Sequence, residues 1–164
     1  DELISVRKTD GKSDLIIGTK KGLSIRFNEE DVRDMGRTAK GVRGIRLRKG
    51  DEVVSAEVAG EKTAILTVTE KGLGKRSKIE EYPVQSRGGK GVISIKIIDR
   101  GGKAVGLMQV RDEDEVVMIT SSGKLIRTLA GNISLHGRNT QGVKLMDVEG
   151  DDKIVSIGKV AERD

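Results

Sequence analysis

A repeat of about fifty residues constrains this chain more than any other feature, because fixed-period self-similarity decides the whole architecture of a fold. The turn GTKKG at 18–22 recurs as TEKG at 69–72 and as TSSG at 120–123. The threonines of these turns are therefore separated by 50 and then 51 residues. They are Thr19, Thr69 and Thr120.

A second, independent segment repeats with the same spacing. GRTAKGVRGIRL at 36–47 recurs as SRGGKGVISIKI at 86–97 and as GRNTQGVKLMDV at 137–148, and its shared glycine is Gly41, Gly91 or Gly142. Two anchors with one period define three units within residues 1–164, which we interpret as a single domain. The units are 13–60, 61–111 and 112–161.

Each unit is predicted to contain four strands. The stretches LIIGTKKGLSIRF, AILTVTEKGLGKR and VVMITSSGKLIRT each place a glycine-containing turn between two apolar runs, which is typical of a hairpin. A third strand is expected where an apolar ladder repeats, as at Val42, Val92 and Val143. DEVVSAEV, KAVGLMQV and DKIVSIGKV supply the fourth strand.

Four strands per unit at this period predict an all-β, propeller-like fold with three blades. The opening ELISV, residues 2–6, resembles a fourth strand and is expected to belong to a preceding blade. Closed propellers have about 4 to 8 blades. Three blades are too few for closure, so we expect open blade edges and leave self-association through them as an alternative.

Composition excludes several functional classes. The chain has no cysteine and a single histidine, His136, so neither a disulfide framework nor a Cys/His metal cluster is available. No apolar run approaches the roughly 18 residues of a membrane span, and the start DELISVRK lacks the layout of a signal peptide. We therefore expect a soluble cytoplasmic protein with no metal and no catalytic residues of its own.

Positive charge is concentrated in parts of the chain. The chain has a net charge of +5, and residues 33–49 contain seven basic residues and one acid. Between Lys124 and Lys144 there is no acidic residue. This pattern favours a nucleic-acid partner. Because Phe27 and Tyr82 are the only aromatic residues, stacking on single strands is unavailable and duplex is the expected form.

Two series of arginines keep the period. One lies seven residues after the shared threonine and the other lies four residues before the shared glycine. We predict that these repeated charges line one rim and neutralise DNA phosphates. With three neighbouring cations they form the predicted DNA-binding set, which is Arg26, Arg37, Lys40, Arg43, Arg76, Arg87, Lys90, Arg127 and Arg138.

The stretches SKIEEYPVQSRGGKGVISIKI at 77–97 and ISLHGRNTQGVKL at 133–145 resemble the C-terminal domain of the DNA gyrase A subunit, and the resemblance covers essentially the whole chain. It implies a six-bladed beta-pinwheel whose blades exchange strands and whose perimeter wraps duplex DNA. This chain would be its last three blades. The implied partners are duplex DNA, the gyrase B subunit, together with the rest of the gyrase A subunit, with a nucleoid-associated location. ATP and Mg²⁺ would be used by other parts of that enzyme, with no cofactor here.

The loop QSRGGKG resembles the family's seven-residue Q-R-R-G-G-K-G box, which normally lies in the first blade. Here it lies in the middle unit with serine at its second place. Its residues are Gln85, Ser86, Arg87, Gly88, Gly89, Lys90 and Gly91. We expect Arg87 and Lys90 to contact phosphate, helped by the backbone N–H groups of the two glycines that follow Arg87. The topoisomerase IV C-terminal domain and a protein-interaction scaffold remain alternatives.

Four other patterns are assigned structural or no special roles. The loop does not fit a nucleotide P-loop, because Lys90 is followed by glycine and no helix is predicted. The run DEDE at 112–115 is expected to be solvated and not to bind Mg²⁺. His136 and Tyr82 occupy positions where the other units have different residue types, so each is interpreted as a packing residue.

Overall fold

Each unit begins with a hairpin whose turn is stabilised by the repeated threonine and glycine. In the first unit, Gly22 has a φ of 81° and its N–H donates to the carbonyl of Thr19. The hydroxyl oxygen of Thr19 accepts the N–H of Leu23 at 3.2 Å. A positive φ is readily adopted only by glycine. The same hydroxyl contact recurs in the other two turns, so this local chemistry explains why the period is visible in the sequence.

The computed structural model describes residues 1–161, and its strands form three antiparallel sheets. The hairpins are β1 (Asp14–Thr19) with β2 (Leu23–Asn28), β4 (Ala64–Thr69) with β5 (Leu73–Lys78), and β8 (Glu115–Thr120) with β9 (Leu125–Leu129). The last strand of each unit pairs with the first strand of its own hairpin. These last strands are β3 (Val53–Ala59), β7 (Ala104–Val110) and β11 (Ile154–Lys159).

The outer strand of a sheet comes from the following unit. β6 (Val92–Ile93) pairs with β2, and β10 (Val143–Lys144) pairs with β5. The sheet orders are therefore β3-β1-β2-β6, β10-β5-β4-β7 and β11-β8-β9, and the third sheet has three strands. The exchange of strands between neighbouring blades agrees with the pinwheel architecture, so the all-β, propeller-like prediction is confirmed.

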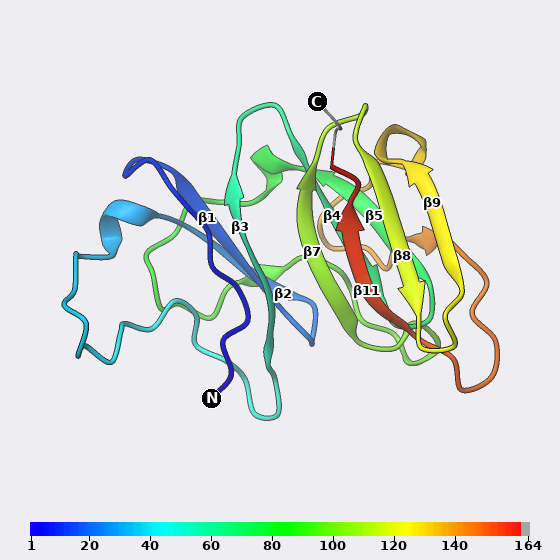
Figure 1. Cartoon of the computed structure of the whole chain (residues 1–164), viewed down its shortest axis with the longest axis horizontal. Coiled ribbons are helices and arrows are strands. Elements are labelled where there is room, and N and C mark those ends of the chain that lie inside the picture. The colour runs from blue at the N-terminus through cyan, green and yellow to red at the C-terminus, as the bar shows by residue number, and fades with distance from the viewer. Residues whose placement is uncertain (162–164) are drawn as a thin grey trace.

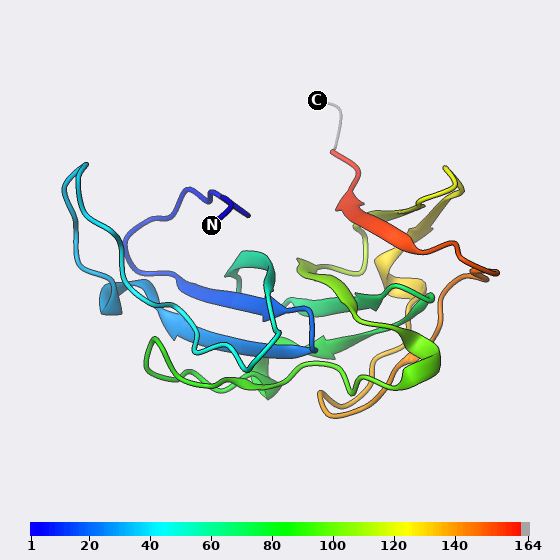
Figure 2. The same cartoon turned by 90° about the horizontal axis from the view of Figure 1, so that it is seen from below.

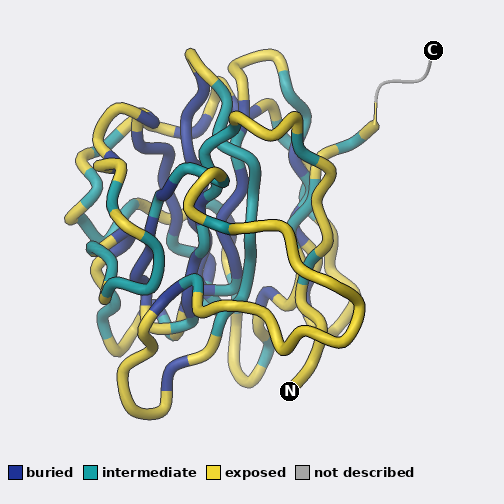
Figure 3. The backbone as a smooth tube through the Cα atoms, turned by 90° about the vertical axis from the view of Figure 1, so that its left-hand side faces the viewer, coloured by how far each residue is buried: buried dark blue, intermediate teal, exposed yellow. Residues whose placement is uncertain are grey.

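The three sheets stand side by side as blades of an open arc (Figure 1). Figure 2 shows that β11 and the N-terminal segment lie on the inner side of this arc. The long connections after the hairpins, drawn in cyan, green and orange, follow its outer side. Figure 3 views the molecule from the side of the first unit, where the chain nearest the viewer is largely exposed. Short single-turn 3-10 helices follow each hairpin and also lie at 99–101. They are Glu29–Asp31, Ile79–Glu81, Asp99–Gly101 and Ala130–Asn132.

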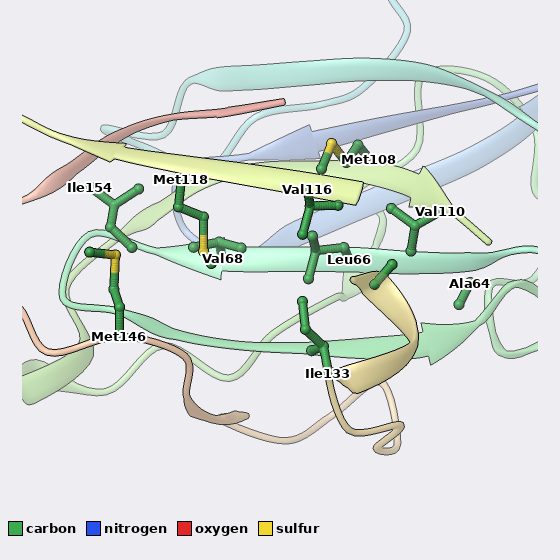
Figure 4. Close-up of a cluster of buried hydrophobic side chains, with 11 residues drawn as sticks. Ala64, Leu66, Val68, Met108, Val110, Val116, Met118, Ile133, Met146 and Ile154 are labelled. Atoms are coloured by element: carbon green, nitrogen blue, oxygen red, sulfur yellow. The ribbon is translucent and has the colours of Figure 1, made fainter. Parts of the chain in front are cut away.

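The core lies between the blades. Every residue of β4 is buried, because the middle blade is covered on both faces by its neighbours. Leu66 and Val68 of β4 face Val116 and Met118 of β8 across the interface between the second and third units (Figure 4). Complete burial of each such side chain contributes roughly 1.5–3 kcal/mol. No helix in residues 1–161 is long and apolar enough to cross a membrane.

Two strand predictions are wrong in detail. Residues 2–6 form no strand. The segment instead lies beside β3, where the Ser5 hydroxyl donates to the carbonyl of Ala56 at 3.4 Å and Arg7 pairs with Glu57 at 3.1 Å. The third strands are only two residues long, and none forms near Val42. The physical reason is that these segments pair with the hairpin of the preceding unit, and residues 1–13 form no hairpin with which the segment near Val42 could pair.

We expect the shared glycine to be essential only where a preceding blade lies against it. Gly91 and Gly142 have φ values of 75° and 78°, and a Cβ would lie 2.4 Å from the carbonyl oxygen of Ser24 and 2.6 Å from that of Gly74. Gly41 has a similar φ of 82° but open space around it. Positive φ costs an alanine about 1–2 kcal/mol, and a backbone clash adds about 1–3 kcal/mol.

Gly91→Ala and Gly142→Ala should therefore lower the free energy of unfolding by about 2–5 kcal/mol, whereas Gly41→Ala should lower it by about 1–2 kcal/mol. Urea unfolding followed by circular dichroism measures all three. Equal losses in the three variants would contradict the assignment of these glycines to the blade junction.

Candidate nucleic-acid interface

The first arginine series connects each unit to the next one. Arg26 projects from β2, and its guanidinium donates to the carbonyls of Ile79 and Tyr82 in the second unit at 3.1 and 3.2 Å. The same guanidinium forms an ion pair with Asp14 at 2.8 Å. These contacts use the side chain for the blade junction, and Arg26 is only partly exposed.

Arg76 is the equivalent residue of the second unit, and it is 6% exposed. Its Nε donates to the carbonyl of Ile133 at 2.6 Å, and its terminal nitrogens bind the carbonyl of Gly131 and the carboxylate of Asp112. The prediction that this repeated charge lies on a rim is wrong for Arg76. The arginine repeats at this position because carbonyl groups of the next blade need a hydrogen-bond donor there.

Arg127 is the residue of this series in the third unit, and residues 1–161 contain no further unit whose carbonyls it could reach. Its guanidinium forms a double contact with the Glu115 carboxylate, and its side chain is 54% exposed. The hydrogen bond and charge of Arg127 lower the pKa of Glu115 from its usual value. Arg127 is therefore exposed at the end of the arc but paired with an acid.

The second arginine series connects each unit back to the preceding one. Arg87 donates to the carbonyls of Asp31 and Arg43 at 3.2 and 2.8 Å. Arg138 donates to the carbonyls of Glu81 and Ile93 at 3.0 and 2.6 Å. The acceptors lie at equivalent positions of successive units. Each junction is thus held by two arginines that point in opposite chain directions.

The box-like loop uses its backbone for the same junction. The N–H of Gly88 donates to the carbonyl of Gly44 at 2.6 Å, and the carbonyl of Gly89 accepts the N–H of Arg46 at 2.7 Å. The N–H of Gln85 donates to the carbonyl of Arg26 at 2.7 Å. The expectation that the Gly88 N–H contacts phosphate is therefore wrong, because this donor is already bonded.

Four residues of the predicted DNA-binding set are exposed and have no ion pair or hydrogen bond from their side chains to any residue in 1–161. They are Arg37, Lys40, Arg43 and Lys90. Three of them lie in the connection 33–49, and Lys90 lies in the equivalent connection of the second unit. Phosphate contact remains a prediction for these four.

The sequence-based prediction omitted other cations on the same connections. Within the described chain, the side chains of Arg33, Arg46, Arg48 and Lys96 are also exposed and make no hydrogen bond or ion pair. The signal was available, because all seven basic residues of 33–49 stand in one nearly acid-free stretch. The predicted set was built on the two repeated arginine series and added only Lys40, Arg43 and Lys90 to them.

Lys75 was also missed, and it is fully buried. Its ammonium donates to the carbonyls of Gly137 and Arg138 and to the hydroxyl of Thr140, with 2.6 Å to the first and 3.0 Å to the last. Burial lowers the pKa of Lys75 to about 8, while the Glu81 carboxylate opposes this shift and Arg138 adds to it. The equivalent positions of the first and third units hold Ile25 and Ile126. A lysine at a position that is apolar in the other two units was therefore a signal in the sequence that Lys75 is buried.

The remaining candidates have structural contacts. Tyr82 is 1% exposed, and its hydroxyl lies 2.9 Å from that of Ser94. The backbone of His136 bonds Arg76 and the hydroxyl of Ser77. In the acidic run, Asp112 and Glu115 pair with Arg76 and Arg127, and Asp114 lies 4.0 Å from Lys159.

We expect Arg76 and Arg127 to contribute differently to the free energy of unfolding, although they occupy equivalent positions. Arg76→Ala removes a buried guanidinium and leaves two carbonyls without their donor, which should cost about 3 kcal/mol of unfolding free energy. Arg127→Ala removes an exposed ion pair and should cost about 1 kcal/mol or less. Urea unfolding of both variants measures this difference. A larger loss for Arg127→Ala would contradict the assignment of Arg76 to the junction.

We expect Lys75 to make stability depend on pH. Its folded-state pKa of about 8 lies below the usual 10.5, so the unfolded chain binds more protons between these pH values. The stability contributed by this position is therefore lowest below pH 8 and increases as the pH rises toward 10.5. Relative to Lys75→Met, the wild-type chain should gain about 2 kcal/mol between pH 7.5 and 10. Urea unfolding at both pH values tests this, and parallel pH profiles would contradict it.

Comparison with known proteins places this geometry in a family. A family model described as the DNA gyrase C-terminal domain, beta-propeller, matches residues 13–59, 63–111 and 114–161. The A subunit of DNA gyrase from Escherichia coli (strain K12) is 49% identical over 162 residues, which cover 99% of this chain and 18% of that protein. The corresponding protein of Clostridium acetobutylicum is 48% identical over 164 residues, which cover 100% of this chain and 20% of that protein. The chain thus spans about a fifth of the length of these curated relatives.

Solved structures show the same architecture. A DNA gyrase A C-terminal domain superposes with a TM-score of 0.85 at 31% identity, covering 92% of this chain and 51% of that one. A C-terminal domain of DNA topoisomerase IV superposes with a TM-score of 0.87 at 27% identity, covering 93% of this chain and 48% of that one. Because the family model matches a segment in each of the three units, the chain belongs to the DNA gyrase C-terminal domain family of beta-propellers.

Proposed function

We propose that this chain is a non-catalytic module that binds duplex DNA and bends it around the outer side of the arc. The observation that carries the proposal is the connection 33–49, whose seven basic side chains are exposed and make no hydrogen bond or ion pair within residues 1–161. Cations kept free of carboxylates on a rigid surface are suited to phosphate, which carries the charge of DNA.

The chemistry of this surface favours backbone contact over base readout. Arginine and lysine neutralise phosphates and release counterions without reading sequence. Phe27 and Tyr82 are 2% and 1% exposed, so neither aromatic ring is available to stack on an unpaired base. The proposed partner is therefore duplex DNA of any sequence.

A curved and rigid body is the second requirement for bending. Smooth bending of a 20 to 30 bp site costs about 1–6 kcal/mol, which must be offset by contacts held at fixed spacing. The junction arginines, exchanged strands and buried interfaces fix the blades relative to one another. The outer connections of successive units are thereby held along one curve (Figure 2).

The comparisons favour a gyrase role over the topoisomerase IV alternative. The two gyrase relatives named above are 48–49% identical to this chain. The topoisomerase IV domain is 27% identical. In this proposal the protein partners are the gyrase B subunit, together with the rest of the gyrase A subunit. They carry the ATP- and Mg²⁺-dependent chemistry, and the complex acts on the nucleoid. Within residues 1–161 the outer edge of β9 pairs with no exchanged strand, so a further blade or a second copy of the chain would add there.

We expect a fluorescent duplex of about 40 bp to bind with an affinity that falls steeply with salt, because each phosphate contact adds about 0.9 to the slope of log K against log salt. The variant Arg33→Gln, Arg37→Gln, Lys40→Gln, Arg43→Gln should reduce that slope by up to about 4. Fluorescence anisotropy from low to high salt measures both quantities.

A matched control changes four exposed cations away from the outer connections, namely Lys8→Gln, Lys12→Gln, Lys62→Gln and Arg111→Gln. It removes the same net charge, so it should weaken binding far less than the first variant. Absence of binding by the wild-type chain at low salt, or equal losses in both variants, would overturn the proposal and favour the protein-interaction scaffold.

A further inference from the structure

The outer connections of the three units differ in charge although they are equivalent in the repeat. Residues 33–49 contain seven basic residues and one acid, and 83–99 contain three basic residues and one acid. Residues 134–150 contain two basic residues and two acids. The net charge of the outer side therefore decreases from the first unit to the third.

Both cations of the third connection make contacts with protein groups. Arg138 donates to the carbonyls of Glu81 and Ile93. Lys144 forms an ion pair with Asp147 at 3.0 Å. This hydrogen bond and the positive charges of Lys144 and Lys124 lower the pKa of Asp147, so this acid is ionised at neutral pH. Every cation of 134–150, a stretch that the structure describes completely, is thus engaged by protein groups.

The second connection differs at two equivalent positions. Lys90 is replaced by Gln141 in the third unit, and Lys96 is replaced by Asp147. Lys90 and Lys96 are both exposed, and their side chains bond to no residue in the described chain. Backbone geometry does not explain the difference, because Ser94 of the second connection and Leu145 of the third donate their N–H groups to equivalent carbonyls, those of Gly22 and Gly72.

We infer that duplex DNA is held along the outer side of the first and second units and leaves the protein before the third. This inference rests on the proposed function and adds a boundary to it. The third unit keeps the shape of the disc, while its outer connection presents two acids and no free cation to phosphate. The contacts of the protein with DNA phosphates therefore end between Lys96 and the third connection.

Three double variants test the boundary on a 40 bp duplex by salt titration. They are Lys40→Gln with Arg43→Gln, Lys90→Gln with Lys96→Gln, and Lys124→Gln with Lys144→Gln. Each removes two positive charges, one from each of two exposed side chains. The first two should each reduce the salt slope by about 2. The third should leave the slope within about 0.3 of wild type, since those lysines make no phosphate contact.

A gain-of-contact variant tests the same inference in the opposite direction. Gln141→Lys with Asp147→Lys copies the second connection onto the third and adds three positive charges. It should increase the salt slope by about 2 to 3 and extend the hydroxyl-radical footprint on the duplex beyond that of wild type. The control Glu2→Lys with Leu3→Lys adds the same charge on the exposed N-terminal segment and should not extend the footprint.

The outcomes separate the boundary from the function on which it rests. Binding by wild type with equal slope reductions in all three double variants would overturn the boundary and leave the DNA-binding function standing. Absence of wild-type binding at low salt would overturn the proposed function itself. An unchanged footprint for the gain-of-contact variant, together with a slope equal to that of its control, would also count against the boundary.

Discussion

The arrangement of the blades depends on arginines of one unit that donate to backbone carbonyls of the neighbouring unit. At each junction one arginine reaches forward, as Arg26 does to Ile79 and Tyr82, and one reaches backward, as Arg87 does to Asp31 and Arg43. A buried carbonyl without a donor costs about 1–3 kcal/mol, and this cost applies to the contact of Arg76 with the carbonyl of Ile133, which is buried. The exchanged strand and the positive-φ glycine then have a single place to lie.

This dependence separates two kinds of positive charge that look alike in the sequence. Arginines that repeat with the period are mostly junction residues, because the backbone they serve repeats with the same period. Cations that do not repeat, such as Arg33 and Arg48, have no such partner in the described chain and remain exposed. Strict periodicity is therefore evidence for a structural role, and departures from it are better evidence for a ligand. Arg37 differs, since residues 1–13 form no hairpin whose carbonyls it could reach, and its side chain stays exposed.

The hairpins could be predicted from sequence because their chemistry is local. The threonine hydroxyl and the glycine φ of each turn lie within four residues of each other, and alternating apolar residues mark the strands on either side. The third strands were predicted at Val92 and Val143, where β6 and β10 begin, but their pairing was not, because their partners belong to another unit and no local pattern records it. The burial of Arg76 and Lys75 was missed for a related reason: charge predicts exposure unless the acceptor groups of a distant segment are known.

The seven residues of the box-like loop include some that bind the preceding unit and one exposed cation that does not. The third unit shows that the cation can be lost while the binding residues are kept. Arg87 and the backbone of Gly88 and Gly89 bind the preceding unit, whereas Lys90 extends from the same loop without a protein partner in residues 1–161. In the third unit Arg138 makes the equivalent contacts, but glutamine stands where Lys90 would be. Loss of the lysine leaves the junction intact, because the junction never used it. A pinwheel built this way can change its charge blade by blade without changing its curvature, so the path of a bound duplex can be set by side chains that contribute almost nothing to the fold.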